Sequence, residues 1–424
     1  MDRLIVTGGA RLEGRLTAAG SKNAVLPVMA ACLLTAEPLV VRRVPALRDV
    51  ATMASILEGL GVEVTREDDV LVLTAGDDGG HEAPYDLVAT MRASICVLGP
   101  LVARHGRASV SMPGGCVFGV RPVDLHVKGL NALGAGIRVE GGYLVADGGG
   151  RLKGSSLFLG TRFGSSVLAT ANVLMAATLA AGRTRIVNAA MEPEVSDLAR
   201  CLVAMGARIT GIGGPELQVE GVERLHGTEF TIGGDRVEAG TFLVGAAMTR
   251  GDVTVDGIDP HQLTVVSETL SEAGAHVEQG DDWLRVRAAG PLRSTDVTTL
   301  PYPGFPTDLQ AQHMAAMTMA DGLSVITERI FPDRFMHVAE LQRLGADIRK
   351  EGTQAIVAGH ARLSGATVMA SDLRASAALV LAGLVAEGVT EVRRVYHIDR
   401  GYERIDARLA GLGAEIRREH QPTP

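Results

Sequence analysis

One short pattern recurs six times in this sequence and limits what the chain can fold into. A leucine is followed four residues later by a glycine, then by a small or β-branched residue and by an aliphatic one. The pattern is typical of a helix that ends at a glycine and turns into a strand. The spacing of about 70 residues is far longer than a solenoid repeat, so the sequence predicts six copies of a small α/β module. The glycines are Gly61, Gly134, Gly206, Gly274, Gly345 and Gly413.

An apolar, alanine-rich helix opens each module behind a polar residue. Residues 24–34, 167–180 and 375–386 are apolar nearly all round, so these helices are expected to be buried and surrounded by sheet. A strand, a second helix and a hairpin follow each of them. The expected openings are residues 21–23, 90–92, 166–168, 238–240, 307–309 and 372–374.

Six modules in 424 residues divide as three plus three, and this division predicts two similar α/β domains with buried helices enclosed by sheets. We expect residues 22–232 to form the first domain and residues 1–21 with 233–424 to form the second. The segment 4–20 has the form of a strand that opens a module, so both ends of the chain are expected in the second domain.

Composition narrows the class of protein. The net charge of −8 argues against a general nucleic-acid binder, which needs a basic surface. Four cysteines are dispersed without CxxC spacing, which favours reduced thiols in the cytoplasm and no zinc site. No signal peptide and no run of 18 apolar residues is present, so neither export nor a membrane span is expected.

The segment 113–126 is the first candidate for chemistry. It places Cys116 among Gly114, Gly115 and Gly119 and continues with Arg121. Glycines keep side chains away from a ligand and tolerate unusual backbone angles, so the thiol is expected to be presented to a ligand. The alternative is that the cysteine is a small packing residue in a turn.

Cations at helix starts are the second candidate. Lys22, Arg92 and Arg374 fall in the first turns of expected buried helices, where a positive charge opposes the helix dipole. Each is either a solvated surface charge or a group that binds an anion. Further arginines on loops, Arg121, Arg334 and Arg400, favour the second interpretation. Together they predict a cationic site for a ligand that carries phosphate and carboxylate.

Asp308 also lies at a helix start, where a carboxylate is either a favourable N-terminal charge or a general base. A carboxylate base and a cysteine acid among arginines would suit addition and elimination on an enol compound. The sequence shows neither a metal-ligand cluster nor a Walker loop, so no metal or cofactor is predicted.

The motifs taken together resemble those of the UDP-N-acetylglucosamine 1-carboxyvinyltransferases, enolpyruvyl transferases that begin bacterial peptidoglycan synthesis. The resemblance covers essentially the whole chain. The fold of that family is a pair of inside-out α/β barrels, each built from three repeated units. This fold agrees with the sixfold pattern. The matching motifs are SKNA at 21–24, TMRAS at 90–94, PGGC at 113–116, GVRPVDLH at 119–126, FPTD at 305–308, RFMH at 334–337, DLRAS at 372–376 and HIDRGYER at 397–404.

The resemblance implies a role for each candidate residue. Cys116 would protonate the methylene carbon of phosphoenolpyruvate, and Asp308 would take the proton of the sugar 3'-hydroxyl. Phosphoenolpyruvate would be held by Lys22, Arg121 and Arg400, with Arg334 and Arg374 in its pocket. The positions that would contact UDP-N-acetylglucosamine are Asn23, Arg92, Arg121, Pro122, Val123, Asp124, Leu125, Ser166, Val167, Asp308 and Ile330. The resemblance implies neither a cofactor nor a metal, and it implies a thiol at Cys116 that fosfomycin alkylates. We also expect a monomer.

Three departures from the family pattern affect the expected sugar contacts: Cys96, Leu168 and a lengthened stretch at 160–165. Two other functions therefore stay open at this point. The chain could transfer enolpyruvate to another acceptor, either shikimate 3-phosphate or a different nucleotide, although the PGGC motif argues against the shikimate enzyme. It could also be a non-catalytic repeat scaffold that binds a partner.

Overall fold

The computed structural model describes residues 2–77, 79–113, 123–147, 149–161, 164–360 and 362–420. The chain forms two compact units. The N-terminal unit is Gly20–Gly233, and the C-terminal unit combines Met1–Ala19 with Gly234–Pro424. The domain boundaries expected from the sequence, 22–232 and 1–21 with 233–424, differ from these by one or two residues.

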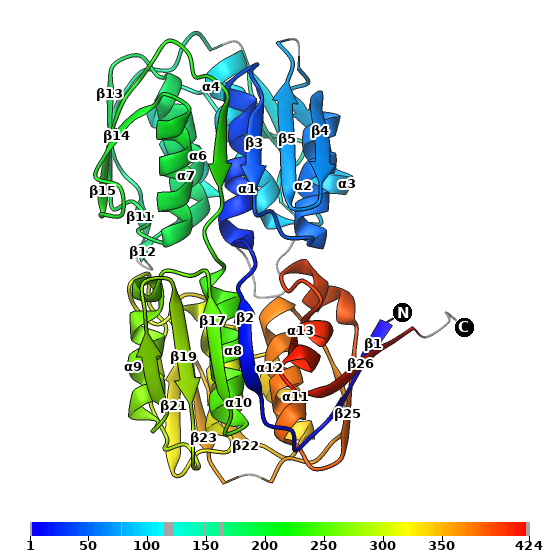
Figure 1. Cartoon of the computed structure of the whole chain (residues 1–424). Coiled ribbons are helices and arrows are strands. Elements are labelled where there is room, and N and C mark those ends of the chain that lie inside the picture. Colours follow the sequence, from blue (N-terminus) through cyan, green and yellow to red (C-terminus); the bar gives the residue numbers. More distant parts are fainter. Residues whose placement is uncertain are drawn as a thin grey trace. The chain divides into compact units, whose positions relative to one another are not determined.

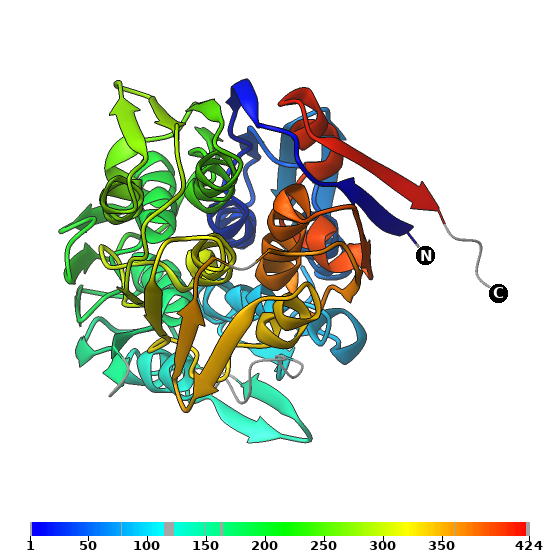
Figure 2. The same cartoon turned by 90° about the horizontal axis from the view of Figure 1, so that it is seen from below.

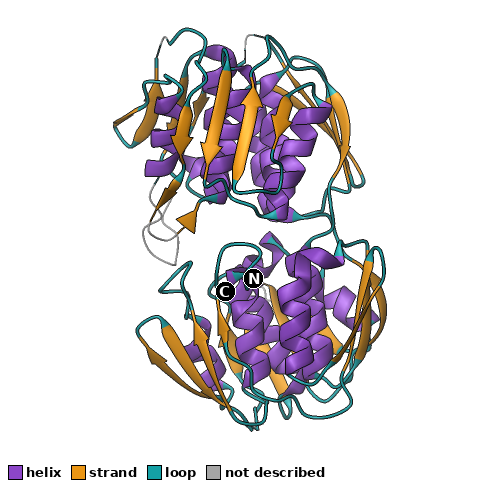
Figure 3. Cartoon of the chain, turned by 90° about the vertical axis from the view of Figure 1, so that its left-hand side faces the viewer, coloured by secondary structure: helices purple, strands orange, loops and turns teal. Residues whose placement is uncertain are grey.

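In the N-terminal unit, helices occupy the centre and three four-stranded sheets lie around them (Figures 1 and 3). Its helices are α1 (Lys22–Ala31), α2 (Arg48–Gly59), α3 (Tyr85–Val88), α4 (Leu98–His105), α5 (Asp124–Ala132), α6 (Val167–Leu179) and α7 (Pro193–Ala204). Its strands are β3 (Leu39–Arg42), β4 (Val62–Glu67), β5 (Val70–Ala75), β6 (Glu82–Ala83), β7 (Ala108–Ser111), β8 (Arg138–Glu140), β9 (Tyr143–Ala146), β10 (Ser156–Phe158), β11 (Gly160–Thr161), β12 (Gly164–Ser165), β13 (Arg183–Val187), β14 (Arg208–Thr210), β15 (Glu216–Glu220) and β16 (Thr228–Thr231).

The C-terminal unit repeats this plan with three more four-stranded sheets. Its helices are α8 (Arg236–Met248), α9 (Thr264–Glu272), α10 (Gln310–Met317), α11 (His337–Arg343), α12 (Leu373–Val385) and α13 (Ile405–Gly411). Its strands are β1 (Asp2–Thr7), β2 (Glu13–Thr17), β17 (Asp252–Asp256), β18 (His276–Gln279), β19 (Trp283–Arg287), β20 (Val297–Thr298), β21 (Leu323–Thr327), β22 (Asp347–Glu351), β23 (Gln354–Ala358), β24 (Thr367–Met369), β25 (Val389–Arg393) and β26 (Glu415–His420).

The central helices are enclosed, as their composition predicts. Helix α6 buries every residue from Ala169 to Leu179, and α12 buries every residue from Arg374 to Leu384. Burial on all sides of such a helix removes its whole apolar surface from water, which is the main favourable contribution to folding. The predicted fold class, α/β with buried helices inside sheets, is confirmed. None of the helices in the described parts of the chain is long and apolar enough to cross a membrane.

Each four-stranded sheet takes its fourth strand from another part of the chain. In the sheet β10-β13-β15-β14, strand β10 comes from the preceding hairpin connection and pairs in parallel with β13. The strands β13, β15 and β14 then pair antiparallel. The same order recurs in the other four-stranded sheets, so every module closes its sheet with a strand of its neighbour.

The N-terminal segment completes the last module. Strand β1 lies between β25 and β26 and pairs antiparallel with both, and Figure 2 shows it running beside the C-terminal strand. Strand β2 pairs in parallel with β17. Arg3 on β1 forms ion pairs with Glu391 and Glu419. The two ends of the chain therefore belong to one unit.

The helix starts agree with the sequence in part. Ser166 accepts a hydrogen bond from the Ala169 amide at the start of α6, and Asp372 accepts from Arg374 and Ala375 at the start of α12. The opening expected at residues 238–240 is wrong, because α8 begins at Arg236 and is capped by Asp235. The openings at residues 90–92 and 307–309 lead into two 3-10 helices, η2 (Arg92–Val97) and η4 (Thr307–Leu309), which precede α4 and α10.

Helices α4 and α5 make their closest contacts with α6 at glycine residues. A Cβ atom at Gly99 of α4 would lie 2.3 Å from the Asn172 carbonyl oxygen, and a Cβ atom at Gly129 of α5 would lie 2.3 Å from Val173 Cγ2. Only a residue without a side chain fits at these contacts. The first contact is the stricter one, since a backbone oxygen inside a packed core cannot rotate away.

We predict that Gly99→Ala lowers the free energy of unfolding by about 1–3 kcal/mol, because the added methyl group overpacks the α4–α6 contact. The control is Gly59→Ala at the end of α2, where a Cβ atom would meet nothing within 4 Å. That substitution is expected to stabilise by about 0.4–1 kcal/mol. Urea unfolding of both variants measures the difference, and equal midpoints would contradict the packing argument.

Candidate active site

Asp308 is the centre of a charged cluster in the C-terminal unit. Arg334 Nη1 donates to its Oδ1 at 2.8 Å, and Arg374 Nη2 donates to its Oδ2 at 3.1 Å. The side chains of the two arginines are 8% and 1% exposed, whereas that of Asp308 is 25% exposed. Asp308 lies in η4, Arg334 precedes α11 and Arg374 lies in the first turn of α12. The fold thus brings together three residues that the sequence singled out separately.

Arg374 has more donors than Asp308 uses. Among the described residues, no hydrogen-bond partner meets its Nε and Nη1, although both are buried. Its guanidinium lies 5.3 Å from the centre of the Tyr402 ring. Burial by itself would lower the pKa of Arg374, but the carboxylates of Asp308 and Asp235 help to raise it above the usual value. A buried, charged guanidinium with donors to spare is suited to bind an anion.

A hydrogen-bonded network fixes the backbone of Asp308. Gln312 Nε2 donates to the Asp308 carbonyl at 3.0 Å, to Thr241 Oγ1 at 3.0 Å and to the Tyr402 hydroxyl at 3.2 Å. The hydroxyls of Thr241 and Tyr402 lie 2.9 Å apart. Burial raises the pKa of Tyr402, which therefore stays protonated. Sequence reasoning missed Gln312, although a polar amide inside a buried helix is a signal that could have found it.

Glu328 organises the other side of the cluster. Its buried carboxylate accepts hydrogen bonds from four neutral donors. They are Thr299 Oγ1 at 2.6 Å, Thr307 Oγ1 at 2.9 Å, Ile330 N at 2.8 Å and Phe331 N at 2.9 Å. Since the Thr307 hydroxyl gives its proton to Glu328, its oxygen is free to accept from Arg334 Nη1 at 3.0 Å. Glu328 therefore holds both Arg334 and the backbone of Ile330, a role that the sequence did not reveal.

Arg400 lies in the same unit as the Asp308 cluster but in a later segment of the chain. It is the last residue of η5 (Val395–Arg400) and is half-buried, and the turn after it leads to the buried Tyr402. The motif that carries Arg400 therefore also supplies the aromatic face beside Arg374.

In the N-terminal unit, Lys22 is the first residue of α1 and forms an ion pair with Asp49 of α2 at 2.9 Å. The two side chains are 13% and 3% exposed. Lys22 is thus not a solvated surface charge, and Asp49 offsets its conflict with the helix dipole. Asn23 follows and is half-buried. Asp49 was not predicted, since only the fold brings α2 to the start of α1.

The remaining candidates in this unit also lie at helix starts. Arg92 begins η2 and is half-buried, as are Ser166 and Val167 at the start of α6. At the start of α5, Val123 and Leu125 are buried and Asp124 is exposed. Cys116, Arg121 and Pro122 lie outside the described residues. Residues 160–165, expected to be a lengthened stretch, include the two-stranded pair β11 and β12.

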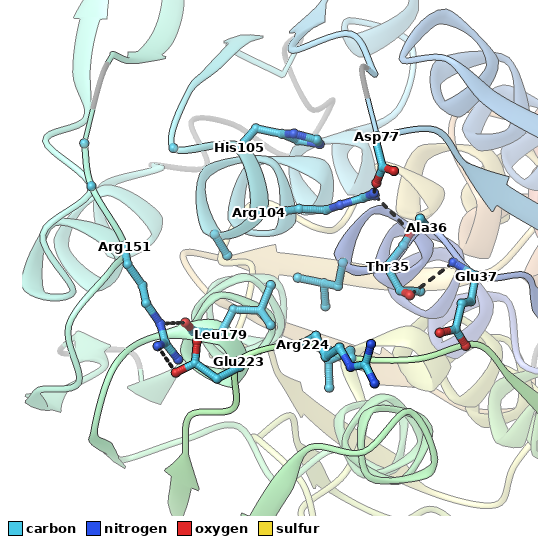
Figure 4. Close-up of a pocket in the computed structure, with 16 residues that line it drawn as sticks. Thr35, Ala36, Glu37, Asp77, Arg104, His105, Arg151, Leu179, Glu223 and Arg224 are labelled. Atoms are coloured by element: carbon cyan, nitrogen blue, oxygen red, sulfur yellow. Dashed lines mark hydrogen bonds and ion pairs between the residues drawn. The ribbon is translucent and has the colours of Figure 1, made fainter.

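A pocket of about 590 Å³ lies at the opposite ends of these central helices (Figure 4). Two of its arginines bind carbonyl groups at or next to helix C-termini. Arg104 Nη1 donates to the carbonyls of Leu33 and Thr35, and Arg151 Nε donates to the carbonyl of Leu179 at 3.0 Å. Cations are favoured beside terminal carbonyls, so this pocket has a structural explanation and is not the candidate site.

Three cysteines are packed in the core. Cys32, Cys96 and Cys201 are free and buried, and burial raises the pKa of Cys96 and of Cys201 to about 12. Burial also raises the pKa of Cys32. Within the described ranges, no group of three or more His, Cys, Asp or Glu side chains could hold a metal ion.

Comparison with known proteins identifies the family. The family model described as EPSP synthase (3-phosphoshikimate 1-carboxyvinyltransferase) matches residues 6–409. UDP-N-acetylglucosamine 1-carboxyvinyltransferase of Paramagnetospirillum magneticum is 53% identical over 99% of this chain and 98% of its own. The enzyme of the same name from Methylacidiphilum infernorum is 54% identical over 99% of both chains. This chain belongs to the UDP-N-acetylglucosamine 1-carboxyvinyltransferase family.

Solved structures support the fold of this family member. The enolpyruvyl transferase NikO from Streptomyces tendae superposes with a TM-score of 0.88 at 24% identity, covering 99% of each chain. EPSP synthase from Acinetobacter baumannii gives a TM-score of 0.75 at 18% identity, covering 99% of this chain and 100% of its own. At such identities the likeness concerns the fold alone.

We predict that Glu328→Gln lowers the free energy of unfolding by about 1–3 kcal/mol, because an amide NH₂ cannot accept from the donors that surround it. The control is Glu351→Gln on β22, where an exposed glutamate pairs with Arg349. A solvent-exposed ion pair contributes about 0–1 kcal/mol. Urea unfolding of the two variants measures both values, and similar losses would contradict the role of Glu328.

Proposed function

We propose that this chain transfers the enolpyruvyl group of phosphoenolpyruvate to the 3'-hydroxyl of UDP-N-acetylglucosamine and releases phosphate. The observation that carries the proposal is the cluster at Asp308, in which a carboxylate lies between two buried guanidiniums and one of them has unused donors. Family membership supports the choice of reaction and acceptor.

Asp308 is the proposed general base. It accepts the proton of the 3'-hydroxyl while the hydroxyl oxygen attacks the central carbon of phosphoenolpyruvate. An arriving phosphate and carboxylate compete with Asp308 for Arg334 and Arg374. The same arginines that hold Asp308 in the free protein therefore turn to the substrate, and the carboxylate is released to take a proton.

Cys116 is the proposed general acid. Its thiol protonates the methylene carbon, which becomes a methyl group in the tetrahedral intermediate. The methyl group then loses a proton as the carbon–oxygen bond to phosphate breaks, and the enolpyruvyl ether and phosphate are the products. No metal or cofactor takes part in this scheme.

The remaining candidate residues are proposed to bind one or the other substrate. Lys22, Arg121 and Arg400 hold phosphoenolpyruvate, together with Arg334 and Arg374. The nucleotide sugar contacts Asn23, Arg92, Arg121, Pro122, Val123, Asp124, Leu125, Ser166, Val167 and Ile330. The network of Glu328 supports the last of these, because it fixes the Ile330 amide.

In the cell, the proposed product is a precursor of peptidoglycan, so the enzyme would serve cell-wall synthesis and thereby cell shape and division. We infer further that it works in the cytoplasm as a monomer. The three free, buried thiols support a reducing compartment.

Phosphate release tests the reaction. We expect release with phosphoenolpyruvate and UDP-N-acetylglucosamine together, and none when shikimate 3-phosphate replaces the nucleotide sugar. Phosphate release with shikimate 3-phosphate but not with UDP-N-acetylglucosamine would overturn the proposed acceptor. Absence of phosphate release with both acceptors would overturn the proposed reaction.

Arg400→Ala is expected to weaken phosphoenolpyruvate binding about ten- to a hundredfold, because a charge-assisted hydrogen bond contributes about 1.5–3 kcal/mol. The matched control is Arg417→Ala on β26, whose side chain is exposed and forms an ion pair with Glu419. Steady-state KM values for phosphoenolpyruvate compare the variants. An unchanged KM in folded Arg400→Ala protein would remove Arg400 from the site.

Fosfomycin is expected to alkylate Cys116 alone. The thiolate opens the epoxide, and nearby cations lower a thiol pKa, whereas burial raises the pKa of Cys96 and Cys201 to about 12. Cys116→Asp should escape the label and keep turnover, because a carboxyl group can still carry a proton. Cys116→Ser should lose most turnover.

Intact-protein mass spectrometry followed by peptide mapping measures the label. A label on Cys32, Cys96 or Cys201 would contradict the assignment, and full turnover of Cys116→Ser would exclude the thiol as the acid.

A further inference from the structure

Asn172 is an amide in the middle of the buried, mainly apolar helix α6. Its side chain is fully buried on α6. A buried amide without partners would lower the stability of the fold, because it loses its hydrogen bonds to water. It finds partners on three other elements. Its Oδ1 accepts from the Gly99 amide of α4 at 2.7 Å, and its Nδ2 donates to the Ile95 carbonyl of η2 at 2.9 Å. Its Nδ2 also lies 2.9 Å from Nδ1 of the buried His126 on α5.

These contacts determine the protonation of His126. The Gly99 amide can only donate, so the oxygen of the Asn172 side chain must face it and the NH₂ group must face the other two partners. One of its hydrogens goes to the Ile95 carbonyl, and the other goes to His126 Nδ1, which must therefore be unprotonated. His126 is the neutral Nε2–H tautomer. In agreement, burial and the charge of Arg92 lower its pKa to about 3.

The partners of Asn172 belong to the segments that carry the acceptor-binding candidates. Ile95 lies in η2, three residues after Arg92. His126 follows Leu125 directly in the first turn of α5. Asn172 itself follows Ser166 and Val167 by about a turn and a half of α6. One side chain thus links the three segments of the N-terminal unit that are expected to hold the nucleotide sugar.

The packing makes this link rigid. The lack of a side chain at Gly99 lets the amide reach Asn172, and the lack of one at Gly129 brings α5 against Val173, the next residue of α6. A shift of any one segment would separate a buried donor from its acceptor, which costs more than an ordinary hydrogen bond contributes.

We propose that Asn172 is a positioning residue for acceptor binding, which acts by holding His126 in the Nε2–H tautomer and by locking η2, α5 and α6 together. The proposal rests on the proposed function. Asn172 touches no substrate in this scheme, and its removal should raise the KM for UDP-N-acetylglucosamine while leaving the KM for phosphoenolpyruvate nearly unchanged.

Asn172→Asp keeps the acceptor for Gly99 but loses both donors, so His126 is expected to carry its proton on Nδ1 instead. We expect a rise of about tenfold or more in the KM for UDP-N-acetylglucosamine. Thr178→Val is the matched control, because Thr178 is a buried polar residue of the same helix whose hydroxyl donates to Met175 within α6. Its KM values should stay within about twofold of the wild type. Equal KM values in Asn172→Asp and wild type would overturn the proposal.

Two variants of His126 separate positioning from direct contact. In His126→Asn, the side-chain oxygen can replace Nδ1 as acceptor for Asn172, so acceptor binding should be largely restored relative to His126→Leu. If both variants lose the same affinity, the imidazole itself contacts the ligand and the positioning role is wrong.

Nitrogen-15 NMR of the histidine side chains provides a readout that needs no turnover. The wild type should show His126 as the Nε2–H tautomer from pH 6 to 8 and Asn172→Asp should not. Observation of Nδ1–H in the wild type would overturn the proposal even if the enzyme were active. A wild type that shows Nε2–H but no phosphate release would instead refute the proposed function.

Discussion

The central helices of each unit are buried on every side, and this constraint places the candidate site at their ends. A helix such as α6 or α12 gains stability only when sheets cover it completely, so its flanks cannot carry ligand-binding groups. Only the first turn can combine a charged side chain with unpaired backbone N–H groups. Lys22, Arg92 and Arg374 occupy such turns, which explains why the candidates fall at equivalent places in different modules.

Charges at these turns need compensation, and the two units provide it in the same way. In the N-terminal unit, Asp49 from a neighbouring helix neutralises Lys22. In the C-terminal unit, Asp308 lies against Arg374 and Arg334. A buried cation without such a carboxylate would cost several kcal/mol, on the order of 3–5. The carboxylates therefore hold the cations in place in the free protein, which is the preorganisation that the proposed exchange with an anionic substrate requires.

The sequence predicted the parts of this arrangement that are local. The sixfold glycine pattern and the apolar helices depend on short-range order, and the structure agrees with them. The chain ends pair across 418 residues, but the strand pattern of residues 4–20 was a local signal that a module was left to complete. The start of α8 was misplaced because the cap signal of Asp235 with Glu238 three residues later was passed over. Asp49, Glu328 and Asn172 were not found, because each has a partner that only the packed fold brings close: Lys22, Thr307 and His126, respectively.

Polar residues are distributed unevenly along the central helices, and this distribution separates the part of each helix that serves stability from the part that serves the candidate site. Polar side chains gather in the first two turns and then give way to apolar ones, as in Arg236, Glu238 and Thr241 of α8, Gln310, Gln312 and His313 of α10, Arg374 and Ser376 of α12, and Thr170 and Asn172 of α6. Because each buried polar group must find partners, a sequence shaped by stability alone would replace them with aliphatic residues. The side-chain hydroxyl of Thr178 near the end of α6 donates to its own helix, whereas the side chains of Asn172 and Gln312 bond to other segments. Polar residues that reach across elements near the helix starts therefore mark the end of each unit that must hold a fixed geometry.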